Sequence, residues 1–316
     1  MKISLGRAFS EALQITLRSR TLWVYGILLV IFGGQCSVPT SSFQGSEDQG
    51  QEFFNSIQRT GDGVILGLAI VVILVVLFFW LLSIVVGNWA LGSLIGGISQ
   101  SLPTGPAYRT GRQAGAVDGS TSFSASSRAG MRAWLKLVII GFLSALSILL
   151  LISPLLGVVA IIFLTGQGVL ALLLLLWLPL AFIGTLFIHL VATMAQIYAV
   201  LGETGVFGSI SAGWRLIMRN MWDILVVWLA NDVGVGCAAG CVTGAVAAAS
   251  IIPAVIGFLI NPAVGLALLA PGLIFLLLIS LAVGVVKVFQ KAIWVIAYRE
   301  LTSPPIEEQE GPHGAI

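Results

Sequence analysis

Long runs of apolar residues alternate with short polar and charged segments along the chain. A run of about 20 apolar residues is long enough for a helix to cross the roughly 30 Å of hydrocarbon in a bilayer. The first predicted span is short, so it needs extra turns from its flanks or a locally thinner bilayer. The pattern predicts six spans, at residues 21–34, 64–86, 134–164, 169–190, from 224 onward, and 266–288.

Three further segments have polar and apolar residues on opposite faces at helical spacing. In residues 1–20, a polar stripe runs from Arg7 to Arg18, and in residues 128–136 basic residues recur every four positions. In residues 205–220, an apolar stripe from Phe207 lies opposite Ser211. Such helices lie in the plane of the lipid headgroups. We expect three interfacial helices, anchored by Arg18, Arg132, Trp214, Arg215 and Arg219.

An interfacial helix followed by a hairpin of two spans is predicted three times along the chain. Residues 10–18 align with residues 211–219 without a gap, matching at Ser10 and Ser211 and at Arg18 and Arg219. In the second and third units, Pro154 corresponds to Pro253 and Pro179 to Pro271. Every unit begins and ends on the same side, so the units share one orientation, unlike the inverted repeats of many transporters.

The predicted fold is therefore an all-α integral membrane protein. It is a six-span helical bundle with three interfacial amphipathic helices and a three-fold parallel repeat. We expect a membrane domain over residues 1–301, with units at about 1–100, 124–203 and 205–300. Residues 302–316 are rich in Pro and Glu, which is typical of a disordered tail.

Composition and charge agree with this prediction. The chain has 316 residues, of which 58% are hydrophobic and only 9% charged. In the six-span arrangement every Lys and Arg except Arg59 lies on one side, and basic segments near span ends stay cytoplasmic. Both termini are then cytoplasmic. A belt of indoles is expected at the same edge, at Trp23, Trp134, Trp214, Trp222 and Trp294.

The sequence contains few signs of catalytic or cofactor chemistry. We find no Walker loop, no dinucleotide-binding fingerprint, no nucleophile elbow and no zinc-protease motif. The two histidines, His189 and His313, are too few for a metal site, and the three cysteines form no disulfide framework. The basic residues are scattered, and the net charge is only +2, so no nucleic-acid surface is expected. We therefore expect a protein that is not an enzyme and has no cofactor.

Asp232, beside Asn231, is the sharpest candidate for a polar site inside a span. It follows Asp223 by about nine residues, which at about 1.5 Å per residue places it near mid-depth. A charge there costs roughly 2.5–3.5 kcal/mol and usually marks a pathway or a partner. The alternative is that residues 231–234 cap a break between two helix segments. His189 is interpreted as an interhelical hydrogen bond or as part of a proton relay.

Small residues recur every four positions at Gly236, Gly240 and Gly244. This spacing lets two helices approach closely. The face packs either within the chain or against another subunit. Cys237 and Cys241 lie one turn apart on the same helix and are interpreted as small packing residues.

The segment from Ala199 to Asn220 resembles a family pattern. An Ala-x-Val-x-Glu-like stretch ends a span, and a Ser-x-x-x-Gly-Trp-x-Leu-x-x-Arg-Asn helix follows. This pattern is similar to uncharacterised bacterial polytopic membrane proteins related to the membrane domain of some glycerophosphodiester phosphodiesterases. The phosphodiesterase domain is absent, so the resemblance implies no such activity. It does imply a bacterial cytoplasmic (inner) membrane.

Two functions are consistent with these features. The first is a non-enzymatic scaffold or accessory subunit at the cytoplasmic leaflet, with membrane lipids and other membrane protein subunits as partners. The second is a transporter or lipid-handling protein with a path near Asp232. A water-accessible pocket that reaches Asp232 would favour the second function, and a closed bundle with an outward Gly/Ala face would favour the first.

Overall fold

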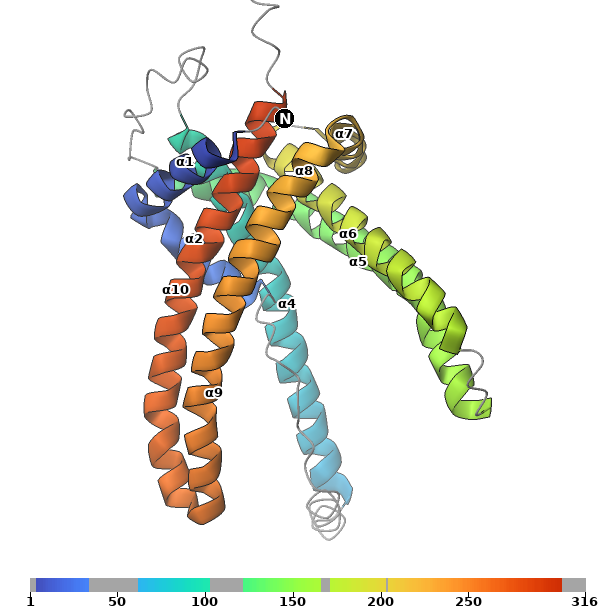
Figure 1. Cartoon of the computed structure of the whole chain (residues 1–316). Helices are drawn as coiled ribbons and strands as arrows, with labels where there is room; N and C mark the ends of the chain where they lie inside the picture. The colour runs from blue at the N-terminus through green and yellow to red at the C-terminus, as the bar shows by residue number, and fades with distance from the viewer. Residues whose placement is uncertain (1–3, 34–61, 103–121, 166–170, 203, 303–316) are drawn as a thin grey trace, which may run out of the picture.

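A computed structural model describes residues 4–33, 62–102, 122–165, 171–202 and 204–302. The regular elements in these ranges are all helical, so the chain is an all-α bundle (Figure 1). Residues 34–61, which include Arg59, residues 103–121, and residues 303–316 of the predicted disordered tail lie outside the described residues. The elements are α1 (Leu5–Arg18), α2 (Arg20–Phe32), α4 (Asp62–Ser101), α5 (Phe123–Thr165), α6 (Ala171–Leu201), α7 (Val206–Arg219), α8 (Met221–Trp228), the π-helix η3 (Leu229–Val235), α9 (Gly236–Ile260) and α10 (Pro262–Thr302).

Five helical segments in the described ranges are long and apolar enough to cross a membrane, which makes the chain a multi-pass membrane protein. A sixth is obtained if α1 and α2, which are bent by 97° at their junction, count as one span. With 13 residues, α2 rises about 20 Å and is shorter than the hydrocarbon. The helix is thus as short as the first predicted span, and its crossing of the membrane stays a prediction.

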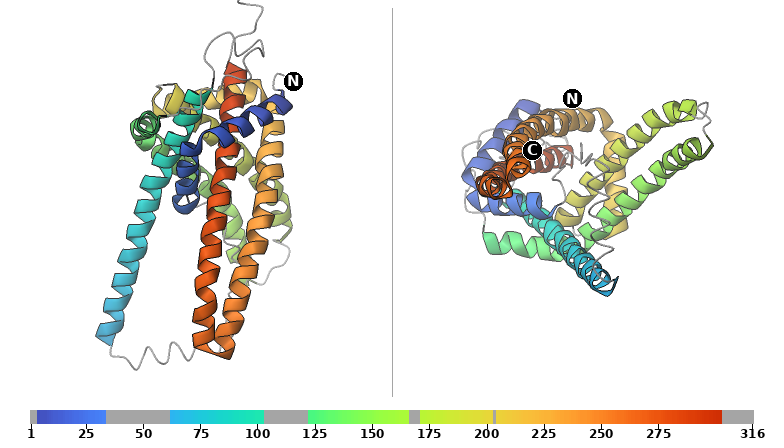
Figure 2. Two further views of the ribbon diagram at one scale, coloured as in Figure 1. Left: turned by 90° about the vertical axis from the view of Figure 1, so that its left-hand side faces the viewer. Right: turned by 90° about the horizontal axis from the view of Figure 1, so that it is seen from below.

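The helices converge at one end and diverge at the other (Figures 1 and 2). We call the converging end the hub; it consists of α1, α2, α7, α8, η3, the first turns of α5 and the last turns of α4, α6 and α10. We call the diverging parts the arms, which are the apolar lengths of α4, of the α5–α6 hairpin and of the α9–α10 hairpin. The arms expose large apolar side chains on many sides, for example Val76, Phe79 and Leu150. Such a surface suits contact with lipid.

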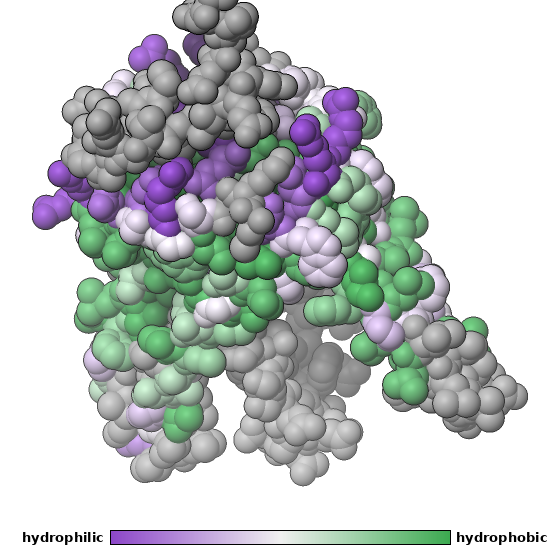
Figure 3. All heavy atoms as spheres, turned by 45° about the horizontal axis from the view of Figure 1, so that its top comes forward, coloured by the Kyte–Doolittle hydropathy of each residue, from purple (hydrophilic) through white to green (hydrophobic). Residues whose placement is uncertain are grey.

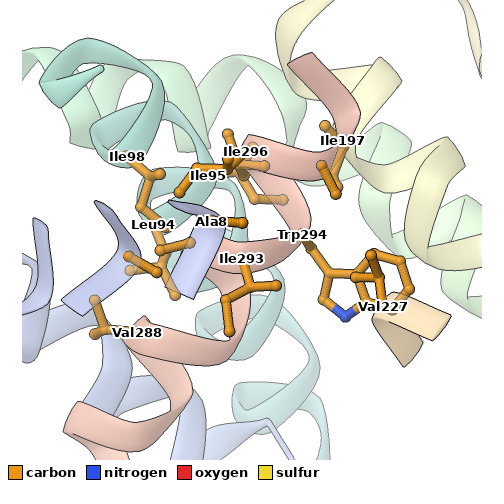
Figure 4. Packing of buried hydrophobic residues seen from close by; sticks show 14 of the residues in the cluster. Ala8, Leu94, Ile95, Ile98, Ile197, Val227, Val288, Ile293, Trp294 and Ile296 are labelled. Atoms are coloured by element: carbon orange, nitrogen blue, oxygen red, sulfur yellow. The ribbon is translucent and has the colours of Figure 1, made fainter. Parts of the chain in front are cut away.

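The main hydrophobic core lies in the hub. The last turns of α4, α6 and α10 contact one another there and each contributes a fully buried side chain, Ile95, Ile197 and Trp294 (Figure 4). Full burial of one such side chain is worth about 1.5–3 kcal/mol. The hub therefore holds the three arms together.

The helices α1 and α7 are structural equivalents. Each has 14 residues, and each is followed by one linking residue, Ser19 or Asn220, whose N–H donates to a carbonyl in the last turn. The buried residues correspond one to one at a constant separation along the sequence. They are Ala8, Ala12, Ile15 and Thr16 in α1, and Ser209, Gly213, Leu216 and Ile217 in α7.

The predicted second interfacial helix is not a separate element. Its residues form the first turns of α5, which continues without interruption to Thr165. Its buried positions Ser126, Gly130 and Ala133 still correspond to Ser209, Gly213 and Leu216. At the position equivalent to the linkers Ser19 and Asn220, α5 has the buried Leu137. Leucine favours the helix more than serine or asparagine does, so the helix does not break there.

Small residues let each of these segments approach the preceding unit closely. A Cβ at Gly130 would lie 2.6 Å from the carbonyl oxygen of Trp89 and 2.8 Å from the amide of Ser93 on α4. A Cβ at Gly213 would lie 3.3 Å from the carbonyl oxygen of Val191 and 3.1 Å from the amide of Ala195 on α6. The same backbone groups are approached in both units. Close contact of this kind requires glycine or another very small residue.

These contacts close a ring. The start of α5 packs on α4, α7 packs on α6, and α1 packs on α10. Each unit thus places its first helical segment on the last helix of the unit before it, and the first unit uses the last helix of the chain. This arrangement fits a repeat whose units share one orientation. The boundaries at about 1–100, 124–203 and 205–300 stay predictions.

A candidate polar site in the hub

Asp232 lies in the π-helix η3, which joins α8 to α9 without a break. The alternative of a break at residues 231–234 is therefore excluded, and this stretch instead widens the helix by a different hydrogen-bond pattern. Asparagine, aspartate and glycine have low helix propensity, so the α-helical alternative is weakly favoured here. Single π-helical turns inside α-helices are frequent at functional sites.

Asn231 joins η3 to α10 through a reciprocal pair of hydrogen bonds. Its side-chain nitrogen donates to the backbone carbonyl oxygen of Gln290 at 3.3 Å, and the side-chain nitrogen of Gln290 donates to the backbone carbonyl oxygen of Asn231 at 3.2 Å. The same nitrogen of Asn231 also donates to Oδ1 of Asp232 at 3.0 Å. Because both neighbours are acceptors, the amide nitrogen must face them. The Oδ1 atom of Asn231 is then buried with no hydrogen-bond partner among the described residues.

Two further side chains reach the carboxylate of Asp232. The indole N–H of Trp294 donates to its Oδ1 at 3.4 Å, and Nε2 of His189 lies 3.8 Å from its Oδ2. At that distance His189 and Asp232 form an ion pair when the imidazole is protonated. Lys291, next to Gln290 on α10, also interacts electrostatically with Asp232.

The structure thus brings together Asn231, Asp232 and His189, the three residues expected to form an intramembrane polar site. It adds Trp294 as a donor, although the sequence pattern assigned this residue to an interfacial belt. That assignment is wrong, because Trp294 is fully buried in the hub core. Gln290 lies four residues before Trp294, and this spacing places both side chains on the same face of α10.

Asp232 lies near the middle of one candidate span, Met221–Val242, and its partners Gln290 and Trp294 lie inside another, Leu281–Thr302. This position agrees with the expected location of Asp232 inside a span, and its depth in the bilayer stays a prediction. Ile224 and Val227, which precede it on the same continuous helix, are buried in the hub core.

The site is partly open. The side chain of His189 is 52% exposed and that of Asp232 is 27% exposed. They lie on α6 and η3. Two surface depressions lie elsewhere. One is on α4 around Trp80, and the other is in the hub between Ser99 and Arg299.

The glycine face of α9 points mostly away from the chain's own helices. A Cβ at Gly236 would lie 3.5 Å from the amide of Gln290, but a Cβ at Gly240 or Gly244 would meet no described atom within 4 Å. Packing inside the chain is therefore not observed for Gly240 and Gly244 among the described residues. Contact with another subunit remains a prediction.

The predicted anchors all lie on the hub surface, where Arg18, Arg132, Trp214, Arg215 and Arg219 are exposed. Figure 3 shows hydrophilic residues gathered around the hub and hydrophobic ones over the arms.

No group of three or more potential metal ligands occurs within the described ranges. No family model, curated protein or solved structure matches the chain.

Proposed function

We propose that this chain is a non-enzymatic scaffold or accessory subunit at the cytoplasmic leaflet of a bacterial inner membrane. The proposal includes a relationship to the polytopic family that the segment from Ala199 to Asn220 resembles. It also places the hub and both termini in the cytoplasm. The support for that orientation is the restriction of Lys and Arg in the described ranges to the hub, because basic residues near span ends stay inside.

The observation that carries the proposal is the outward direction of the small-residue face of α9. A Cβ added at Gly240 or Gly244 would find no described atom nearby, and the neighbouring Cys237 and Cys241 are exposed. Lipid tails do not require small residues on a helix, whereas a second helix does. The hub holds this face in place while the arms remain separate.

The test is purification in a mild detergent, followed by mass spectrometry and measurement of particle mass. A stoichiometric protein partner is expected with the wild-type chain. Gly240→Leu should release it. Gly157→Leu, on the α5 arm where a Cβ also meets nothing within 4 Å, should retain it and serves as the matched control. Particles of equal mass and composition for wild type and Gly240→Leu would contradict the proposal.

The orientation has a separate test. Reporter fusions at residue 316 and at residue 118 should both report the cytoplasm. A periplasmic signal at either position would reverse the assignment.

A second candidate function, a transporter or lipid-handling protein, is favoured by the partly exposed pair of His189 and Asp232. A carboxylate and an imidazole at this position can hold a proton or a cationic group. Asp232→Asn should then abolish lipid or solute movement in proteoliposomes while the protein level stays unchanged. Equal movement by the variant and the wild type would remove this candidate.

A further inference from the structure

The three equivalent segments that form the ring also share exposed residues. The pairs Leu13/Leu17 on α1, Met131/Leu135 on α5 and Trp214/Met218 on α7 occupy corresponding positions, and each side chain is 47% to 65% exposed. Residues four apart lie on the same helix face, so each pair forms one apolar ledge. The ledges lie beside the buried residues that fix each segment to the hub.

Basic residues follow the same correspondence. They come one position after each member of the apolar pair, so each ledge has a cationic rim on the adjacent face. The rim is formed by Arg18 on α1, Arg132 and Lys136 on α5, and Arg215 and Arg219 on α7. On α1 the first of the two positions is the uncharged Gln14.

This combination has a defined physical use at a bilayer surface. Apolar side chains of an interfacial helix enter the boundary between headgroups and acyl chains, to a depth of about 5–10 Å. Neighbouring Lys and Arg residues then meet the phosphates, and each is worth about 1 kcal/mol near an anionic leaflet. In Figure 3 the hydrophilic residues border the hydrophobic surface of the arms, where headgroups would lie.

We propose that the hub carries three equivalent binding sites for anionic phospholipid headgroups, one on each ledge and rim. This inference rests on the proposed membrane orientation and names the lipid class of the partner. It does not depend on the glycine face of α9, so the two proposals can fail separately.

The three sites differ in strength. The site on α7 has two arginines, and the exposed Trp222 follows it. On α5, the Nζ of Lys136 donates to the carbonyl oxygen of Thr204 at 3.0 Å and is partly occupied by the chain itself. The site on α1 has a single basic residue in its rim. The expected order of affinity is therefore α7 first, then α5, then α1.

The experiment is native mass spectrometry of the purified full chain in detergent, titrated with phosphatidylglycerol and, in parallel, with phosphatidylcholine. The wild type should bind up to three phosphatidylglycerol molecules with graded affinity, and raised salt should weaken them. The double variant Arg215→Gln/Arg219→Gln should weaken the tightest site by about five-fold for each arginine removed. Arg215→Lys/Arg219→Lys keeps the charge and should keep most of the binding.

Three outcomes would overturn the proposal. The first is equal binding of phosphatidylcholine and phosphatidylglycerol. The second is an unchanged tightest site in Arg215→Gln/Arg219→Gln. The third is displacement of the lipid by inorganic phosphate at comparable concentration, which would indicate a simple anion site. Loss of the protein partner in Gly240→Leu has no bearing on these readouts.

Discussion

Arg7 and Glu300 form an ion pair that joins the first helix to the last, with Nη2 of the arginine 2.7 Å from Oε1 of the glutamate. The side chain of Glu300 is only 8% exposed, whereas that of Arg7 is 37% exposed. The pair lies at the contact of α1 with α10 and so secures the closure of the ring.

Removal of Arg7 should destabilise the protein more than removal of both charges. Arg7→Gln leaves a buried carboxylate without its partner, and a hydrogen bond to a charged group is worth about 1.5–3 kcal/mol. Arg7→Gln/Glu300→Gln removes the unpaired charge and should recover part of the loss. Thermal unfolding in detergent of both single variants and the double variant measures the coupling. Strictly additive effects would show that the pair contributes no coupling.

The ring of contacts predicts that the protein tolerates circular permutation. A circular permutant that joins the natural ends and opens between residues 112 and 113 should fold, because α1 and α10 already lie together. Expression level and elution from a sizing column are the measurements. A permutant opened inside α6 between Thr193 and Met194 is the control, and it should fail because both residues are buried in the hub. Failure of both permutants alike would count against ring closure.

The close approaches at Gly130 and Gly213 predict a graded response to alanine. Gly130→Ala should cost more than Gly213→Ala, since its Cβ meets backbone at 2.6 Å rather than 3.1 Å. Overpacking of this kind typically costs about 1–3 kcal/mol. Gly141→Ala, where a Cβ meets nothing within 4 Å, should be neutral or stabilising by up to about 1 kcal/mol. Unfolding midpoints in detergent rank the three variants.

The hydrogen bonds between η3 and α10 predict a cost for shortening Gln290. Gln290→Ala removes one of two donors to the backbone carbonyl oxygen of Asn231, which still accepts from the N–H of Gly236. The expected destabilisation is that of one lost hydrogen bond, about 0.5–1.5 kcal/mol. Gln100→Ala, at the exposed end of α4, is the matched control and should change little. Equal unfolding midpoints for both variants would mean that the pair of bonds is not needed for stability.

The arms and the interfacial segments could be predicted because each carries its own local signal. Apolar runs of span length are visible without any knowledge of tertiary contacts, and a period of 3.6 residues marks α1 and α7. The match of Ser10 with Ser211 and of Arg18 with Arg219 already pointed to equivalent helices. Their buried residues, which include Ala12 and Gly213, then confirmed the equivalence.

The remaining features depend on contacts between distant residues. Asn231 and Gln290 are far apart in sequence, so their pairing has no local pattern. The stripe at Gly240 and Gly244 shows that a helix face is small but not which way it points. At the position of the linkers Ser19 and Asn220, α5 has Leu137, and a single leucine among many carries too little information to predict that the helix continues there.

The packing of α1 on α10 has a consequence during translation. Synthesis begins at the N-terminus, so α1 leaves the ribosome long before the helix it rests on exists. Ala8, Ala12 and Ile15 stay uncovered until translation is nearly complete. A product that stops early therefore exposes the apolar residues of a first helix that has no helix to dock on.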